Sequence, residues 1–190
     1  KEAGRCIGDS PWVKKLTIEA PKTPEWFSQF CTGLVWNRSI DRLSLTECDF
    51  NGAPTTITAL WPFLELNSNL RSLEIISCHL GDEITRLLAL ALSRRCDKST
   101  LRQINLEANV IGDESGKELI DVLKGYNNLS ELSLGDNEIG TRSCIELSNL
   151  LSSPNCNLRK VNLENNSIGD AGITSITNAL ACNMSLKELC

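Results

Sequence analysis

The sequence has little of what binding to membranes or nucleic acids requires. No apolar run approaches the roughly 20 residues of a membrane-spanning helix, and the first residues, KEAGRCIGDSPW, lack the apolar core of a signal peptide. Lys and Arg form no run, and the formal net charge is −5. Because clustered cations bind nucleic acids and anionic membranes, we expect no nucleic acid and no membrane as the main partner.

Residues that carry out chemistry are equally scarce. The one histidine, His79, has no nucleophile or carboxylate at a fixed offset, and the nine cysteines never occur as C-x-x-C. This spacing argues against zinc-binding and thioredoxin-like sites. We therefore predict a protein that is not an enzyme and holds no metal and no cofactor. The odd number of cysteines favours reduced thiols in a cytosolic or nuclear protein, and we expect a cytoplasmic location.

One pattern recurs along the chain. Residues 101–112, LRQINLEANVIG, match the leucine-rich-repeat pattern L-x-x-L-x-L-x-x-N/C-x-L. A period of 27 to 31 residues separates the repeats and leaves room for one strand and one full α-helix in each. We predict an α/β leucine-rich-repeat solenoid of about six repeats plus a truncated seventh. The repeats begin at Val13, Ile40, Leu70, Leu101, Leu129, Leu158 and Leu186.

Amphipathic patterns predict the helices independently of the strands. Asp82 is expected to cap one helix, and Thr23 with Pro24 to begin another. Pro62 is expected to end or kink the helix of the second repeat, because it removes a backbone hydrogen bond. The residues expected on buried helix faces are Phe27, Phe30, Cys31, Leu34, Ile57, Leu60, Leu64, Ile84, Leu87, Leu88, Ala91, Leu92, Leu119, Ile120, Leu123, Cys144, Leu147, Leu151, Ile173, Ile176 and Leu180.

The strings IGDE at residues 111–114 and IGDAG at residues 168–172 add a family resemblance. With the repeats, they resemble the ribonuclease-inhibitor type of leucine-rich repeat, which is also found in NOD-like receptors and in the GTPase-activating protein for Ran. The resemblance covers roughly residues 13–190 and implies a right-handed horseshoe, with a parallel β-sheet on the concave face and α-helices on the convex face. No catalytic motif of the family can be placed on a position of this sequence.

Within a single leucine-rich-repeat domain of residues 1–190, we expect three parts. Residues 1–39 are an atypical N-terminal capping unit, residues 40–185 are regular repeats, and residues 186–190 begin a truncated repeat. Large aromatic side chains are expected to cover the first repeat, with an aromatic ligand cage as the alternative. All four tryptophans lie in the first third of the chain: Trp12, Trp26, Trp36 and Trp61.

The other end of the predicted solenoid leaves an unpaired apolar strand. Leu186 and Leu189 lie in that strand and have no following repeat. We expect the chain to continue beyond Cys190 in nature, or this edge to pack against something. If the edge is uncovered, the chain is expected to self-associate through it.

The ninth position of each repeat is expected to be buried in the turn after the strand. An amide there can bond both backbone N–H and carbonyl groups, so that stacked copies form a ladder, and a cysteine does this more weakly. Two ladder cysteines would lie about 4.8 Å apart on neighbouring strands, so a disulfide stays open, although buried thiols are favoured. The position is occupied by Pro21, Cys48, Cys78, Asn109, Asn137 and Asn166.

The strand residues between the leucines point away from the core and form the candidate binding surface. They are short, polar and acidic toward the ends of the strands, whereas five of the seven residues at the second position are basic. Such columns orient a partner, although charged strand faces also keep a sheet soluble. The candidate partner-binding residues are Glu74, Asn105, Glu107, Glu131, Ser133, Asp136, Lys160, Asn162 and Glu164.

These observations predict a non-catalytic scaffold that binds a protein partner on its concave face. The family resemblance leaves two alternatives open. One is a GTPase-activating regulator similar to the Ran activator, which would orient a partner's own catalytic groups. The other is the recognition domain of a larger NOD-like sensor.

Overall fold

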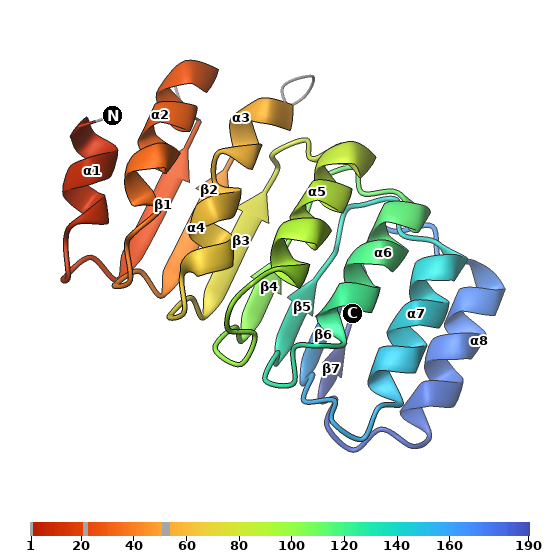
Figure 1. Cartoon of the computed structure of the whole chain (residues 1–190). Coiled ribbons are helices and arrows are strands. Elements are labelled where there is room, and N and C mark those ends of the chain that lie inside the picture. The colour runs from red at the N-terminus through yellow and green to blue at the C-terminus, as the bar shows by residue number, and fades with distance from the viewer. Residues whose placement is uncertain (1, 21–22, 51–53) are drawn as a thin grey trace.

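The structure is a parallel β-sheet with a layer of helices on one side (Figure 1). The computed structural model describes residues 2–20, 23–50 and 54–190. Seven strands follow one another across the sheet in chain order, and every neighbouring pair is parallel. This order confirms the predicted solenoid. The strands are β1 (Lys15–Glu19), β2 (Arg42–Thr46), β3 (Ser72–Ile76), β4 (Gln103–Asn105), β5 (Glu131–Ser133), β6 (Lys160–Asn162) and β7 (Glu188–Leu189).

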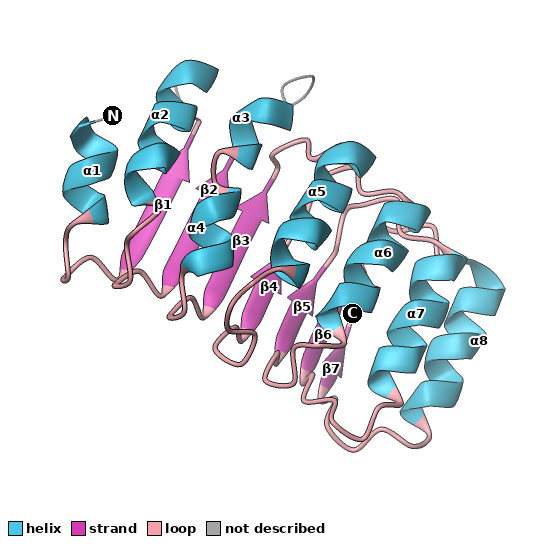
Figure 2. Cartoon of the chain, in the orientation of Figure 1, coloured by secondary structure: helices cyan, strands magenta, loops and turns pink. Residues whose placement is uncertain are grey.

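The helices all lie on one side of the sheet and leave the other side open (Figure 2). We call that open side, which faces away from the helices, the concave face. One helix precedes β1, and each following connection between strands carries at least one helix. The helices are α1 (Glu2–Gly8), α2 (Pro24–Leu34), α3 (Pro54–Thr58), α4 (Trp61–Leu66), α5 (Gly81–Ser93), α6 (Asp113–Leu123), α7 (Thr141–Leu151) and α8 (Gly169–Leu180).

The repeat leucines form the core between the sheet and the helices. Because the strands are in register, the middle apolar residue of each strand stacks on its counterpart in the next strand. Burying a column of such side chains stabilises every repeat through its neighbours, as in other solenoids. The column of residues that are at most 1% exposed consists of Leu43, Leu73, Ile104, Leu132 and Val161.

Several helix predictions are confirmed. The Thr23 hydroxyl accepts a hydrogen bond of 3.2 Å from the Trp26 N–H at the start of α2. In the second repeat the helical segment is divided into α3 and α4, and Pro62 is the second residue of α4. A proline fits the first turn of a helix, where its missing N–H is not needed, and it cannot donate to the carbonyl four residues earlier, that of Thr58, where α3 ends.

The expected capping role of Asp82 is wrong. Helix α5 begins after Leu80, without a side-chain cap. The Asp82 carboxylate instead accepts hydrogen bonds from the Gly112 N–H at 2.9 Å and from the Ser115 hydroxyl at 2.6 Å, both at the start of α6. The side chain reaches the neighbouring helix because successive helices of the solenoid lie side by side. An aspartate in the first turn therefore caps the helix of the next repeat.

Asp113 repeats this arrangement one unit later. Its carboxylate accepts hydrogen bonds from the N–H groups of Gly140, Arg142 and Ser143 at 2.8 to 3.0 Å, at the start of α7. The approach is close enough that a Cβ on Gly140 would lie 2.8 Å from the carboxyl carbon of Asp113. The equivalent residue in α7, Thr141, donates its hydroxyl to the Ile168 carbonyl at 3.0 Å.

The expected role of the tryptophans, which was to cover the first repeat, is wrong. Trp12 and Trp36 are 84% and 73% exposed, and Trp26 is 42% exposed while it stacks on Phe30. Trp61 is buried, but it belongs to α4 of the second repeat and not to the first. Large aromatic side chains therefore do not enclose the end of the core.

Helix α1, which the repeat pattern did not predict, packs beside α2 in their place (Figure 1). The two helices approach through glycines. A Cβ on Gly4 would collide with the Phe30 carbonyl oxygen, and a Cβ on Gly33 would collide with the backbone of α1. This contact covers the first repeat from the helical side.

The predicted asparagine ladder is confirmed at the described positions. Asn137 shows the full pattern: its Oδ1 accepts from the N–H groups of Asn109 and Ile111 at 3.0 Å, and its Nδ2 donates to three carbonyls at 2.9 to 3.0 Å. The thiols of Cys48 and Cys78 donate longer bonds of 3.2 to 3.6 Å to carbonyls in the same place. Pro21 lies outside the described residues.

A second group of buried amides, which the sequence analysis missed, lies at the opposite end of the strands. Asn67 is fully buried; its Oδ1 accepts from the N–H groups of Asn69 and Leu70, and its Nδ2 donates to the carbonyls of Asn37 and Ile40. Asn37 and Asn183 accept from the backbone in the same way. The signal was an asparagine three residues before the first apolar residue of the repeat.

The last repeat is more open than expected. Ile173 was predicted to be buried, yet it is 57% exposed, because α8 packs against α7 on one side and no helix of the described chain covers the other. Leu189, in strand β7, is 41% exposed. Self-association through this edge stays a prediction.

Candidate partner-binding site

The concave face is built from columns of side chains that the parallel register aligns. Each repeat contributes its third and fifth residues, on either side of the buried middle residue, so that Glu131 pairs with Lys160 and Ser133 with Asn162 on adjacent strands. The backbone then turns sharply at the eighth position, where non-glycine residues adopt a positive φ. These residues are Ala20, Glu47, Ser77, Ala108, Asp136 and Asn165, with φ between 39° and 56°.

Glu107 is the centre of a hydrogen-bonded network across three repeats. Its Oε1 accepts hydrogen bonds from the Ser133 hydroxyl at 2.6 Å and from Asn162 Nδ2 at 2.8 Å, and its Oε2 lies 3.5 Å from Asn105 Nδ2. A Cβ on Gly135 would lie 2.9 Å from Nδ2 of Asn162, so the glycine leaves room for the Asn162 side chain to reach Glu107. The carboxylate is therefore held in one orientation on the open face.

The network also fixes the charge of Glu107. The hydrogen bond from Ser133 is the main cause that lowers the pKa of this carboxyl below its usual 4.5. Burial acts in the opposite direction, and the hydrogen bonds from Asn162 and Asn105 add to the lowering, as does the nearby charge of Lys160. Glu107 is thus a preoriented anion at neutral pH.

Six of the nine predicted site residues come together in one place. They line a shallow groove of about 260 Å³ over strands β4 to β6, which we call the Glu107 patch: Asn105, Glu107, Glu131, Ser133, Lys160 and Asn162. Lys160 also forms an ion pair of 2.7 Å with Glu188 of strand β7.

The other three predicted residues lie outside this groove. Glu74 lines a neighbouring groove over strands β1 to β5. Asp136, which lies in the turn after β5, accepts a hydrogen bond of 2.8 Å from Asn165. Glu164 follows β6 and is exposed.

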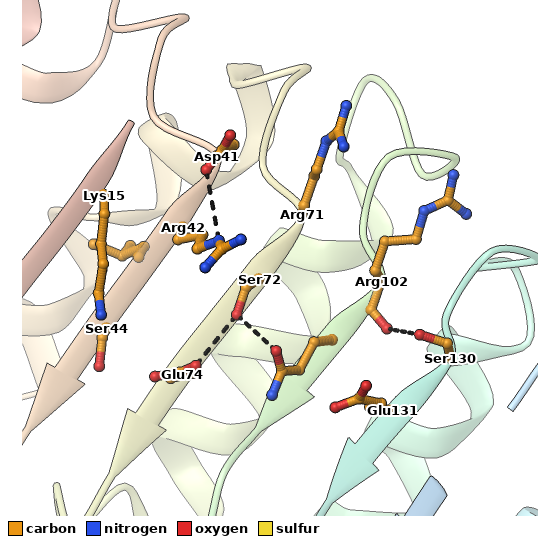
Figure 3. Close-up of a pocket in the computed structure, with 12 residues that line it drawn as sticks. Lys15, Asp41, Arg42, Ser44, Arg71, Ser72, Glu74, Arg102, Ser130 and Glu131 are labelled. Atoms are coloured by element: carbon orange, nitrogen blue, oxygen red, sulfur yellow. Dashed lines mark hydrogen bonds and ion pairs between the residues drawn. The ribbon is translucent and has the colours of Figure 1, made fainter. Parts of the chain in front are cut away.

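The neighbouring groove is richer in cations than the sequence analysis expected. It has a volume of about 370 Å³, and Glu131 belongs to both grooves. Figure 3 shows Arg71 and Arg102 extending from the starts of β3 and β4, away from Glu74 and Glu131. Lys15 and Arg42, also lining residues, were not predicted, because their register continues through the uncharged Ser72 and Gln103 to the acidic Glu131 and does not form a basic column. We call this the basic groove, after Lys15, Arg42, Arg71 and Arg102.

The cysteines do not contribute to either groove. All nine lie in the described part of the chain and are free thiols, and four of them are buried. Burial is the main cause that raises the pKa of Cys31 to about 12 and that of Cys144 to about 11. Across residues 2–20, 23–50 and 54–190 there is no group of three or more His, Cys, Asp or Glu residues placed to hold a metal ion. No helix in that same part is long and apolar enough to span a membrane.

Comparison with known proteins identifies the repeats. A family model described as Leucine Rich repeat matches residues 66–89, 97–119, 127–148 and 155–176. Among solved structures, the chain entitled leiomodin-1 Actin-Binding Site 2 superimposes with a TM-score of 0.62 at 19% identity, covering 87% of this chain and 91% of that one. This likeness concerns the fold alone.

Two curated relatives are similar in sequence. NACHT, LRR and PYD domains-containing protein 5 of Mus musculus is 34% identical over 197 residues, which is 90% of this chain and 17% of that protein. Ribonuclease inhibitor of Mus musculus is 30% identical over 165 residues, which is 85% of this chain and 35% of that protein. The chain thus spans about a third or less of each. With the matched repeats and the parallel sheet, these similarities show that the chain belongs to the leucine-rich-repeat proteins of the ribonuclease-inhibitor type.

Proposed function

We propose that the chain is a non-catalytic scaffold that binds a protein partner on its concave face, at the Glu107 patch. The observation that carries this proposal is the network around Glu107, which holds a charged carboxylate in place on an open surface. A curved sheet face of a repeat protein offers a large area without needing catalytic groups. One relative, ribonuclease inhibitor, is named for acting on another protein.

The geometry favours binding in two ways. Side chains that are already hydrogen-bonded lose little conformational entropy when a partner docks, so more of the contact energy appears as affinity. Anions at the Glu107 patch and cations in the basic groove present opposite charges to one partner, which fixes its orientation. A partner with a basic group opposite Glu107 and Glu164 fits this arrangement.

Charge reversal tests the proposal. The double variant Glu107→Lys, Glu164→Lys is compared with the wild type and with a control variant, Glu83→Lys, Glu118→Lys, which changes two exposed carboxylates on helices α5 and α6. Proteins captured from extract by wild type and control are expected to be lost by the concave variant. Unfolding midpoints of all three chains show whether a loss reflects binding. If every captured protein survives the concave reversal, the assignment to this patch is wrong.

A second proposal concerns the protein to which the chain contributes. Similarity to a NACHT, LRR and PYD domains-containing protein over 90% of the chain supports a role as the recognition part of a larger sensor, located in the cytoplasm. Sequencing the full-length gene tests this directly. A NACHT-coding segment in the same reading frame is expected, and a complete gene without one contradicts the proposal.

A further inference from the structure

We propose that the basic groove binds a carboxylate-rich polypeptide segment. The groove lies on the concave face beside the Glu107 patch and is lined by four cations, Lys15, Arg42, Arg71 and Arg102. The inference rests on the proposed function, because it assumes that a polypeptide docks on this face. It adds the chemistry of the docking segment and the residues that recognise it.

Three of these cations have no carboxylate of the described chain to neutralise them. Lys15, Arg71 and Arg102 form no ion pair with any residue in the described ranges, and Arg102 donates only to the backbone carbonyl of Asn128, at 3.2 Å. Arg71 and Arg102 stand on adjacent repeats and extend freely from the sheet (Figure 3). A guanidinium group presents donors in a fixed fork that matches a carboxylate, so each can take one carboxylate of a ligand.

Two of the three acidic residues of the groove share a repeat position with its cations: Asp41 lies in the column of Arg71 and Arg102, and Glu131 lies in the register of Lys15 and Arg42. Asp41 lies 4.0 Å from Arg42, and Glu74 accepts a hydrogen bond of 3.3 Å from the Ser72 hydroxyl. Glu74 and Glu131 lie farther along the strands than Arg71 and Arg102 (Figure 3). They repel an acidic ligand on one side of the groove and so direct its carboxylates toward the starts of the strands.

The charge distribution favours a short acidic peptide. The second position of the repeats carries five basic residues and one acidic residue across the seven repeats, whereas the whole chain has a net charge of −5. Most of the surface thus repels a long polyanion such as nucleic acid, and the cations act only locally. The four cations lie at or just before the starts of strands β1 to β4, across about 14 Å at about 4.8 Å per strand, which an extended peptide of four or five residues spans.

The test is a titration with labelled peptides. The probes are a fluorescein-labelled decapeptide of alternating Glu and Gly, the same peptide with Lys in place of Glu, and a single-stranded oligothymidylate of ten nucleotides. The variants are Arg71→Glu, Arg102→Glu in the groove and Arg159→Glu, Lys187→Glu as control. The control residues occupy the same column, are exposed, and give the same change of net charge outside the groove.

The wild-type chain is expected to bind the Glu peptide and not the Lys peptide. The groove variant should raise the Kd for the Glu peptide by about tenfold or more, whereas the control variant should raise it by less than about threefold. Equal losses of affinity for the Glu peptide in both variants, or no binding of this peptide by the wild type, would overturn the proposal. Tighter binding of the oligothymidylate would assign the groove to nucleic acid and overturn it as well.

The two proposals fail separately. Direct peptide binding does not depend on Glu107 or Glu164, so the variant that reverses them should still bind the Glu peptide, because removing two anions weakens repulsion. If the captured protein survives that reversal while the groove variant loses the peptide, the Glu107 patch is wrong and the basic groove stands.

Discussion

The hydroxyl of Ser133 donates a hydrogen bond of 2.6 Å to a carboxylate oxygen of Glu107, across neighbouring repeats. Neither residue belongs to the repeat consensus: Ser133 is the last residue of β5, and Glu107 lies two residues after the end of β4. Their contact shows how the solenoid builds a site: the leucines fix the spacing of the strands, and variable residues on adjacent strands then meet at hydrogen-bonding distance.

Replacing Ser133 with alanine tests the electrostatic role of this contact. Because the Ser133 hydrogen bond is the main cause of the lowered pKa of Glu107, the Ser133→Ala variant should raise that pKa toward its usual value. The titration is followed by NMR of the side-chain carboxyl carbon. Ser130→Ala is the control, since the Ser130 hydroxyl donates to the Arg102 carbonyl and not to a carboxylate. An unchanged titration of Glu107 in the Ser133 variant would contradict this account.

Capping between repeats predicts a stability difference between two equivalent aspartates. Asp113→Ala removes three hydrogen bonds to the start of α7 and should lower the free energy of unfolding by about 1 to 2 kcal/mol. Asp170 is the equivalent residue of the last helix, where no further helix is described for it to cap. Asp170→Ala should therefore change stability little. Urea denaturation measures both, and equal losses would argue against capping across repeats.

Asp113 also predicts how stability depends on pH. Burial acts to raise the pKa of Asp113, but hydrogen bonds from Ser143, Arg142 and Gly140 outweigh it and lower the pKa from its usual 3.8. A carboxyl whose pKa is lower in the folded state stabilises the fold above its unfolded pKa, and this contribution is lost as pH falls through the folded pKa. The difference in the free energy of unfolding between the wild type and Asp113→Ala should therefore be constant near neutral pH and shrink below about pH 4. A difference that is unchanged down to pH 2 would be inconsistent with an ionised cap.

The second group of buried amides predicts a larger effect. Asn67→Ala removes the partner of four backbone groups, two N–H and two carbonyl, in three buried hydrogen bonds and one part-buried one, and should cost about 3 kcal/mol. Asn178→Ala, at an exposed position on α8, should cost less than about 0.5 kcal/mol. Thermal and urea unfolding measure both. A loss of stability in Asn67→Ala as small as that in Asn178→Ala would show that these amides contribute little.

The fold could be predicted in detail because the repeat is redundant. Seven copies of one pattern fix the strand positions, and the apolar spacing of residues such as Leu119 and Leu123 fixes the helices. The errors fall where a side chain acts outside its own repeat. Asp82 satisfies every local rule for a cap, and only the arrangement of neighbouring helices shows that it caps α6. Trp12 and Trp36 are large and apolar, yet α1 covers the end of the core.

The candidate site was predicted only in part for a related reason. Comparing the same position in successive repeats predicted Ser133 and Asn162 from the fifth position and Glu107 from the seventh. The structure brings these three residues together. A groove, however, is lined by residues from several repeat positions on several strands. Which residues line it depends on the length and direction of each side chain. Lys15 and Arg42 therefore emerged only from the three-dimensional arrangement.

The central claim is that a protein partner docks on the concave face, and site-specific photo-crosslinking tests it most directly. A photoreactive phenylalanine analogue is placed at Glu131, on the concave face and outside the Glu107 network, or at Glu118, on helix α6 of the convex face. Each chain is irradiated in extract of cells that express the protein. The account predicts a covalent adduct with a discrete partner from position 131 and none from position 118. An adduct from position 118 with none from position 131 would contradict it.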